Sequence, residues 1–384
     1  MLQCLAVAIR PLRVEDLAEL LAFEFDAAPG GIPKYRAAWR LDDKTQAVLS
    51  TCSSLVIITD DDWCSPYSGH FGSQVVQFSH FSVKEFLLSN RLGDFCAYHI
   101  RPASAHTTLT QACLGSLIHL DDHAHEESET GSPLAGYAAQ HWVEHVRFEN
   151  VMSCVKEGMK ILFDSDKPHL TAWIGIYDID SDFYWFLFPN SETSLAPKPK
   201  PNPVYYSALC GFYDLVEHLA SQHLKHVNAI YGRYNFPLYA ALSKDYVEVA
   251  ELLLKHGASV DVQDKTTGKT ILLEVLSRSE RNLVSIVKIL LSHGADANAR
   301  DNTLKCPLHL LAEHASDLEV AQVLLEHKAD VHPQDNNGKT PLHILLEHWI
   351  FLEDYVLDHA RLLLDHRADV NKRDKDGQTP YIWQ

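Results

Sequence analysis

The chain has 384 residues, enough for two or three domains, and 51 acidic against 33 basic residues give it a net charge of −18. Phosphate groups repel such a chain, which argues against a nucleic-acid duplex or an anionic membrane surface as its partner. Its eight cysteines show no CxxC pair and no framework spacing, and no apolar run approaches the roughly 20 residues of a membrane span. We therefore expect a cytoplasmic protein, with the nucleus as the open alternative.

Residues 1–96 predict a small domain of helices around a β-hairpin. The start, Met1–Arg10, is apolar but has no basic segment, so we expect a buried helix rather than a signal peptide. Apolar periodicity and β-rich runs predict helices at Leu2–Ile9, Val14–Phe23 and Ala47–Leu55, strands at Val56–Thr59 and Val75–Phe78, and a helix opened by the capping box Ser82–Glu85. Three helices with a two-stranded wing predict a winged helix.

Winged helices can bind DNA through their third helix, which enters the major groove. Here that helix opens with Asp42 and Asp43 and offers a single basic residue, Lys44. The long loop Asp60–Ser73, which would form the wing, is acidic as well. Repulsion from phosphate makes DNA a poor ligand for this domain.

Residues 97–186 predict a helical module that braces the winged helix. The expected helices are Thr107–Leu120, Leu134–Phe148, Val151–Phe163 and an aromatic run from Trp173 to Trp185. Residues 187–202 are rich in proline and predict a stiff, extended linker. Docking of a domain that binds proline-rich segments is the alternative reading of this stretch.

From residue 203 onward one unit recurs every 34 to 39 residues. Its starting positions are Pro203, Pro237, Ile271, Pro307, Pro341 and Pro380. A period near 33 residues is typical of stacked helical repeats, and the phrase Thr340–His343 resembles the TPLH motif of ankyrin repeats. The resemblance implies that residues 203–384 form an ankyrin solenoid of five repeats and the start of a sixth. The chain is therefore expected to be mainly α.

Each part of the repeat has a physical reason. A proline at the first helical position lacks only an N–H that would have no partner there. The second helix of each repeat is apolar around most of its circumference, which predicts that it is squeezed between neighbouring repeats. Gly257 and Gly294 predict a left-handed residue after that helix. Lys328 and Arg367 stand at the same place in later repeats, where a side chain costs about 1 kcal/mol.

The N-terminal half carries a second resemblance, on the segments Leu2–Phe23, Leu49–Leu55 and Phe78–Leu87. These are similar to the winged-helix region that follows the NTPase core of fungal NACHT proteins, and the similarity continues through residues 97–186. NACHT proteins belong to the STAND signalling ATPases, whose members often end in ankyrin repeats. The resemblance implies the regulatory and sensor part of such a protein, with the NTPase core upstream or lost and a NACHT NTPase domain as one partner.

His80 precedes the fourth helix and resembles the winged-helix histidine that STAND ATPases place against the β-phosphate of ADP. The resemblance implies a nucleotide contact for His80 when an NTPase core is present. In this chain alone the nucleotide would have no other contacts, so a structural role is the alternative.

Sequence signals for an enzyme are weak. Residues 267–270 and 337–340 both read Xaa-Gly-Lys-Thr, but a phosphate loop needs another glycine five residues earlier, where Gln263 and Pro333 stand. Both stretches fall on the turn of the predicted ankyrin hairpin, where glycine permits the bend. There is no GxSxG or HExxH motif. We predict a protein that is not an enzyme and has no cofactor.

Histidines and acids cluster after the helix that ends near Leu120. The cluster comprises His119, Asp121, Asp122, His123, His125, Glu126 and Glu127. Zinc needs three or four converging ligands, whereas this cluster runs into a Ser/Glu/Gly loop, so we predict a solvated loop and no metal. Other histidines recur with the repeat, at helix ends and in the TPLH position, and we predict structural roles for them: His256, His293, His327 and His366, and His309 and His343.

These patterns predict a protein–protein interaction module that binds its partner along the concave side of the ankyrin repeats. The expected contact residues are Asn302, Thr303, Lys305, Glu313, His314, Asn336, Asn337, Lys339, Glu347 and His348. A stand-alone ankyrin scaffold without a signalling role, or an ATPase subunit completed in trans, are the alternatives. Because Thr379–Gln384 opens a sixth repeat and stops, we also expect self-association through an uncapped apolar face.

Overall fold

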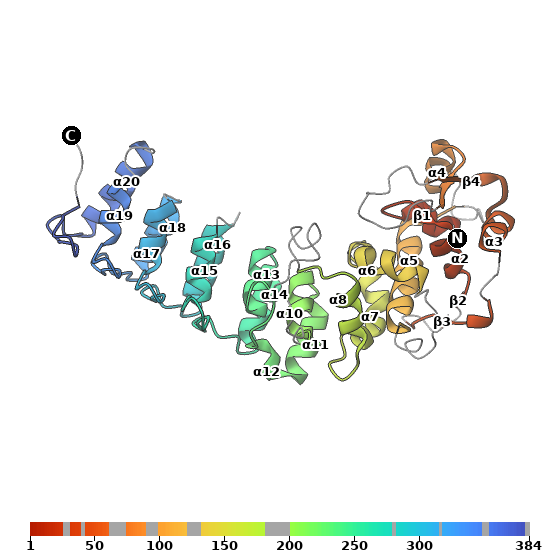
Figure 1. The fold of residues 1–384 in the computed structure, drawn as a ribbon, viewed down its shortest axis with the longest axis horizontal. Coiled ribbons are helices and arrows are strands. Elements are labelled where there is room, and N and C mark those ends of the chain that lie inside the picture. The colour runs from red at the N-terminus through yellow and green to blue at the C-terminus, as the bar shows by residue number, and fades with distance from the viewer. Residues whose placement is uncertain are drawn as a thin grey trace. The chain divides into compact units, whose positions relative to one another are not determined.

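The computed structural model describes residues 1–25, 31–39, 43–60, 74–89, 99–120, 132–180, 200–278, 282–314, 317–347 and 353–380 (Figure 1). The chain divides into two compact units, Met1–Pro203 and Val204–Gln384. Both are dominated by helices. The finer division of the first unit near residues 96 and 186 stays a prediction, and most of the predicted linker lies outside the described residues.

The first unit begins with helices around a small sheet. In chain order its elements are α1 (Leu2–Val7), β1 (Leu12–Arg13), α2 (Val14–Leu20), β2 (Phe23–Glu24), β3 (Lys34–Tyr35), α3 (Lys44–Cys52), β4 (Val56–Asp60), β5 (Gln74–Phe78) and α4 (Phe81–Leu88), with short 3-10 turns at Ala37–Trp39 and Ser53–Leu55. The main sheet is antiparallel, in the order β1-β5-β4. It therefore has one strand more than the predicted hairpin, because β1 is too short to show an alternating pattern.

The predicted boundaries of α2 and α4 are wrong. The helix predicted for Val14–Phe23 ends at Leu20, and Phe23 instead pairs with Tyr35 in the β2–β3 ribbon, with ring centroids 5.4 Å apart. The last helix begins at Phe81 rather than after Ser82. Its N-cap is His80, whose Nδ1 accepts the backbone N–H of Ser82 at 3.2 Å, so the predicted capping box does not form.

The helical part of the first unit follows as α5 (Pro102–Ile118), α6 (Pro133–Val146), α7 (Val151–Leu162) and α8 (His169–Ile176). Its core holds Trp142, Phe163 and Trp173, with the two indole rings edge to face at 5.1 Å. Trp173 also donates its indole N–H to the carbonyl of Ala139 at 3.0 Å. The helix predicted from Trp173 to Trp185 begins earlier, at His169, and α8 ends at Ile176 because the backbone is extended at Tyr177; residues 181–185 lie outside the described residues.

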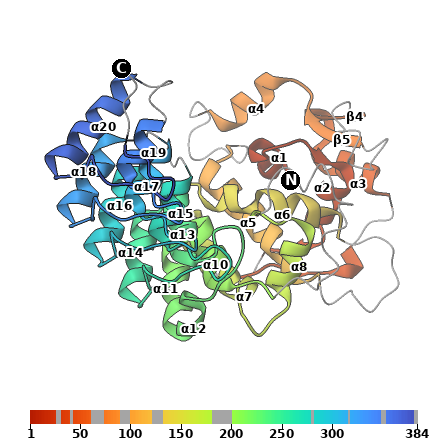
Figure 2. The ribbon, with the colours of Figure 1, turned by 60° about the vertical axis from the view of Figure 1, so that its left-hand side comes forward.

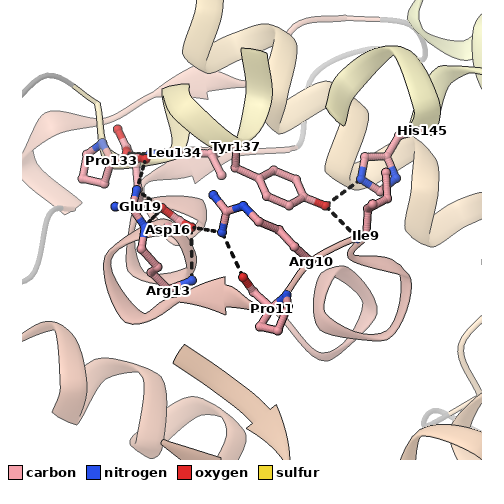
Figure 3. Close-up of polar contacts among 10 residues, drawn as sticks. All are labelled: Ile9, Arg10, Pro11, Arg13, Asp16, Glu19, Pro133, Leu134, Tyr137 and His145. Carbon is pink, nitrogen blue, oxygen red and sulfur yellow. Dashed lines mark hydrogen bonds and ion pairs between the residues drawn. The ribbon is translucent and has the colours of Figure 1, made fainter. Parts of the chain in front are cut away.

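A buried cluster of charges joins α2 to the first turn of α6 (Figure 3). The carboxylate of Asp16 is fully buried and accepts hydrogen bonds from the guanidinium groups of Arg13 at 2.8 Å and Arg10 at 3.3 Å. Glu19 accepts the backbone N–H of Leu134 at 2.8 Å. Leu134 lies at the N-terminal end of α6, where the helix dipole favours a negative charge.

The second unit is a series of helix pairs. The first helices are α10 (Pro203–Cys210), α13 (Pro237–Ser243), α15 (Ile271–Ser277), α17 (Pro307–His314) and α19 (Pro341–Glu347), and the second helices are α11 (Tyr213–Gln222), α14 (Val247–Lys255), α16 (Leu283–Ser292), α18 (Leu318–Glu326) and α20 (Glu353–Asp365), with a short α12 (Leu224–Val227) after α11. Each first helix begins at the residue that the repeat predicts. Figure 2 shows the first helices in one layer and the second helices in another.

The first helix of each pair, not the second, is enclosed on nearly all sides, which corrects the prediction. Residues Pro237–Leu242 of α13 and Pro341–Leu346 of α19 are all buried. In α14 the buried residues are Val249, Ala250, Leu252 and Leu253, while Glu248 and Glu251 are exposed. Helix α17 touches a first helix on either side, α15 and α19, and the polar TPLH histidines of α17 and α19 are buried.

Candidate protein-binding surface

Four of the repeat boundaries carry a hairpin turn that is held by an aspartate. Asp301 accepts the backbone N–H groups of Thr303 and Lys305 through one carboxylate oxygen, at 2.8 and 2.9 Å. Asp335 does the same for Asn337 and Lys339, also at 2.8 and 2.9 Å. Asp264 and Asp374 hold the hairpins before and after these. Hydrogen bonds from Thr266 and Thr267 lower the pKa of Asp264 to about 2.

Backbone hydrogen bonds link successive hairpins. Asn302 donates its N–H to the carbonyl of Thr267, Asn336 donates to Thr303, and Lys375 donates to Asn337, each at 3.0 Å. The side chains of the two asparagines add bonds to the preceding hairpin. The hairpins thus form a continuous edge whose backbone is held in register, and exposed side chains on it have fixed spacing.

Glycine is needed at this edge for steric as well as conformational reasons. Gly268 and Gly338 have φ of +72° and +77°, and a Cβ atom on Gly338 would lie 2.8 Å from the backbone nitrogen of Lys375. Both glycines therefore belong to hairpin turns. This agrees with the sequence analysis, which placed both stretches on hairpin turns rather than in phosphate loops. The equivalent residue of the middle hairpin is Leu304, which has φ of +62° and is 42% exposed.

A lysine on three successive hairpins reaches the last turn of the first helix that follows. Lys305 contacts Glu313, and Lys339 contacts Glu347 at 2.5 Å between Nζ and Oε1. The bond to Glu347 raises the pKa of Lys339. In the preceding repeat Lys269 donates to the hydroxyl of Ser277 at 2.8 Å. Four of the predicted contact residues are therefore paired with one another, and a partner meets ion pairs at these positions rather than isolated charges.

The TPLH histidines connect each first helix to the next hairpin. His309 accepts the backbone N–H of Cys306 at Nδ1, 3.2 Å away, and its Nε2–H donates to the carbonyl of Lys339 at 3.0 Å. His343 makes the same bonds to Thr340 and Gln378, at 3.1 and 3.2 Å. Burial lowers the pKa of His309, in keeping with a neutral ring. The structural role predicted for these two residues is confirmed.

The histidines at the ends of the second helices are structural as well. His293, His327 and His366 each donate Nδ1–H to the carbonyl four residues earlier, at 2.8 to 3.0 Å. The residue that follows has a positive φ in each repeat, as predicted, at Gly294 (+87°), Lys328 (+67°) and Arg367 (+68°).

Lys328→Gly is expected to raise the free energy of unfolding of the second unit by about 1 kcal/mol, because glycine adopts this conformation without strain. Gly294→Ala is the matched control, and it is expected to lower the free energy of unfolding. No heavy atom lies within 4 Å of a Cβ built there, so conformation alone should lower the stability by a similar amount. Chemical denaturation monitored by circular dichroism measures both. Shifts of the same sign would show that the left-handed backbone is not what decides stability here.

The predicted contact residues fall into three groups. Asn302, Thr303, Asn336 and Asn337 are exposed on consecutive hairpins. Lys305, Glu313, Lys339 and Glu347 form the two ion pairs beside them. The side chain of His314 and all of His348 lie outside the described residues. We name the first two groups together the tip strip.

Sequence reasoning missed the aspartates that hold the hairpins and the exposed Leu304. The aspartates carry a signal that could have been read, since Asp301, Asp335 and Asp374 each precede the proline of their repeat by the same interval. Leu304 can be recognised as unusual only once the residues at the same position of the adjacent hairpins, Gly268 and Gly338, are known to have positive φ. Both belong to the hairpins rather than to the helices, where the apolar periodicity gives no information.

The second unit contains ankyrin repeats. The family model for ankyrin repeats (3 copies) matches residues 204–301 and 273–374. Ankyrin repeats are a non-enzymatic class of fold and indicate a protein–protein interaction module.

Two curated proteins are similar to the chain. It is 29% identical over 279 residues to azaphilone pigments biosynthesis cluster protein L of Monascus ruber, a match that covers 67% of this chain and 55% of that protein. The chain thus spans about half the length of this relative. It is also 35% identical over 69 residues to alpha-latrocrustotoxin-Lt1a of Latrodectus tredecimguttatus, which covers 18% of this chain and 5% of the toxin.

Other kinds of site find little support in the described ranges. Those residues contain no group of three or more histidine, cysteine, aspartate or glutamate side chains arranged to hold a metal ion. The acidic residues after His119 that were weighed as ligands lie outside them. No helix within the described part of the chain is long and apolar enough to cross a membrane.

Proposed function

We propose that this chain is the regulatory and sensor part of a NACHT-type signalling protein, located in the cytoplasm, and that it binds a protein partner along the tip strip. In this proposal residues 1–96 are a winged-helix domain, 97–186 a bracing helical module, 187–202 a linker and 203–384 an ankyrin solenoid. The observation that carries the binding role is the tip strip, where exposed polar side chains stand on hairpins that are hydrogen-bonded to one another.

The signalling role is supported by the order of elements in the first unit. Helix α1, strand β1, helices α2 and α3 and strands β4 and β5 follow one another as in a winged helix, and β1 pairs with β5 in one sheet. His80 caps α4 through Nδ1, a structural role that is compatible with the proposed nucleotide contact only if Nε2 provides it. Reading the genomic frame upstream of the Met1 codon tests this part. A phosphate loop there supports the proposal, and its absence favours a stand-alone scaffold.

The binding role follows from how the strip is built. Its side chains are held by a rigid edge, so a partner loses little conformational entropy on their account. The paired lysines and glutamates leave the strip close to electrically neutral, which favours a polar, extended protein segment over a highly charged one. Leu304 adds one exposed apolar side chain at the centre of the strip.

An alanine variant of Thr303, Leu304 and Asn337 is expected to weaken partner binding at least tenfold, since a few hot positions carry about 1–2 kcal/mol each. A partner is first identified by cross-linking and mass spectrometry, and its affinity is then measured by calorimetry with purified components. The control replaces Glu248, Glu251 and Lys255, which line an open groove on the second-helix side. A larger loss from the control than from the strip variant would place the binding surface elsewhere.

The variant Lys339→Glu with Glu347→Lys sharpens the experiment. It keeps the ion pair but reverses the charges that the strip presents, and because such partly exposed pairs contribute less than about 1 kcal/mol, the melting temperature should barely move. Reduced affinity at unchanged stability then assigns these side chains to the interface.

A further inference from the structure

A chain of hydrogen bonds runs through the interior of the first unit, from the connector between α1 and β1 to helices α6 and α5. Figure 3 shows it as far as His145. The backbone N–H of Ile9 lies 3.2 Å from the hydroxyl of Tyr137, and that hydroxyl lies 2.7 Å from Nε2 of His145. Nδ1 of His145 lies 2.9 Å from Nδ1 of His106. Tyr137 and His145 are both fully buried.

One set of proton positions satisfies every bond in this chain while both histidines are neutral. Tyr137 accepts the N–H of Ile9 and donates its own proton to Nε2 of His145. The single proton of neutral His145 then lies on Nδ1 and is donated to Nδ1 of His106, whose own proton lies on Nε2. Protonation of His106 would set two N–H groups against each other across 2.9 Å. Protonation of His145 would take its acceptor nitrogen away from Tyr137. This arrangement of bonds is complete only when both rings are neutral.

The surroundings also disfavour a positive charge. Burial lowers the pKa of His145 to about 3, with smaller contributions from His106 and His141, and burial also lowers the pKa of His106. His141 has its pKa lowered to about 4 by burial and by Arg10, and both of its ring nitrogens are buried without a hydrogen-bond partner. Arg10 itself lies 5.0 Å over the ring of Tyr137.

Among the described residues, no carboxylate contributes to the pKa of His145 or His106, and Glu144 of α6 lies 4.0 Å from Nδ1 of the neighbouring His141. Asp16 of α2 is engaged by Arg10 and Arg13. Besides burial, Cys4 of α1 and Cys113 of α5 contribute to raising the pKa of the Tyr137 hydroxyl. Burial raises the pKa of both thiols. The faces that α7 and α8 bury are apolar apart from the indole N–H of Trp173, which already donates to Ala139.

We propose that the chain Ile9–Tyr137–His145–His106 is a proton-sensitive latch, which holds the connector between α1 and β1 on α6 while both imidazoles are neutral and releases it on acidification. The release affects the connector because Ile9 and Arg10 both contact Tyr137, the residue of α6 whose hydroxyl bonds to His145. Once released, the histidines titrate near their ordinary pKa of about 6.5, so the equilibrium moves toward release only below that pH. Each proton that binds only in the released state increases the released fraction by up to about tenfold for each unit by which the pH falls.

Hydrogen exchange of the whole chain, expressed as protection factors that correct for the pH dependence of the intrinsic exchange rate, tests the latch. Between pH 6.5 and 5.5 the protection of residues 8–13 is expected to fall about tenfold, whereas between pH 8 and 7 it should not change. His145→Gln keeps a donor and an acceptor but does not titrate, so its connector should show much less pH dependence. The control is His293→Gln at the exposed end of α16, which should behave as the wild type.

Protection that is equal at both acidic pH values, or a pH dependence that survives in His145→Gln, would overturn the proposal. Because that variant could fail to fold, the wild type is also titrated with nitrogen-labelled histidine and NMR. Two imidazoles that are still neutral at pH 5.5 in the folded chain support the latch, and His145 titrating at its ordinary pKa refutes it.

Discussion

Asp16→Ala is expected to lower the free energy of unfolding of the first unit by about 3 kcal/mol, the largest effect of a single substitution outside the apolar core. The carboxylate is fully buried and receives hydrogen bonds from two guanidinium groups and from the backbone N–H of Arg13. Removing it leaves Arg13 with its bond to the carbonyl of Pro133 and strips α2 of its N-terminal acceptor. Arg10 is about one-third exposed, so its guanidinium can be solvated in the variant. The expected loss of stability is therefore near the lower end of the range for breaking a buried ion pair.

Asp43→Ala is the matched control, because Asp43 also accepts a backbone N–H at the start of a helix, that of Gln46 at 2.9 Å, but is exposed and pairs with no arginine among the described residues. It should lower stability by no more than about 1 kcal/mol. Urea unfolding monitored by the fluorescence of the buried Trp142 and Trp173 reports on the first unit. Equal losses from the two variants would mean that the arginine pairs contribute nothing beyond capping.

The repeated half of the fold could be predicted residue by residue because its determinants are local. A proline or its substitute marks the start of every first helix. The left-handed residue after the second helix is a glycine in two repeats, and in two more it was predicted because Lys328 and Arg367 align with those glycines. These features involve neighbours within one turn, so they leave a periodic trace in the sequence. Which helix is enclosed could not be predicted in the same way, because enclosure depends on how the repeats stack rather than on the composition of one helix.

The first unit was harder to predict because its key contacts join distant residues. Glu19 bonds to Leu134, and His145 bonds to His106, and in both pairs each partner taken alone looks like an ordinary helix residue. The ion pairs of the tip strip show the same limit over a shorter distance. Lys339 and Glu347 were each predicted to be a separate contact for a partner, and only the fold shows that they contact one another.

His309→Ala is expected to lower the free energy of unfolding of the second unit by about 2–3 kcal/mol. The imidazole is fully buried, and its loss leaves the backbone N–H of Cys306 without its acceptor and removes a donor from the carbonyl of Lys339. The hairpin that contains Lys339 carries half of the tip strip, so exchange of the amides at residues 335–339 should accelerate more than exchange in the first unit.

The same residue makes a prediction for pH. Burial lowers the pKa of His309 in the folded chain, so the unfolded chain binds a proton more readily. The stability that neutral His309 provides is therefore fully present above about pH 6.5 and is lost as the pH falls below that value. His309→Ala should lose this part of the acid sensitivity along with the stability. The control is His293→Ala, which removes an exposed histidine that bonds only within its own helix end, and should cost about 0.5 kcal/mol or less. If the two variants unfold at the same urea concentration, and both keep the wild-type pH profile, then the bridge from α17 to the next hairpin does not stabilise the stack.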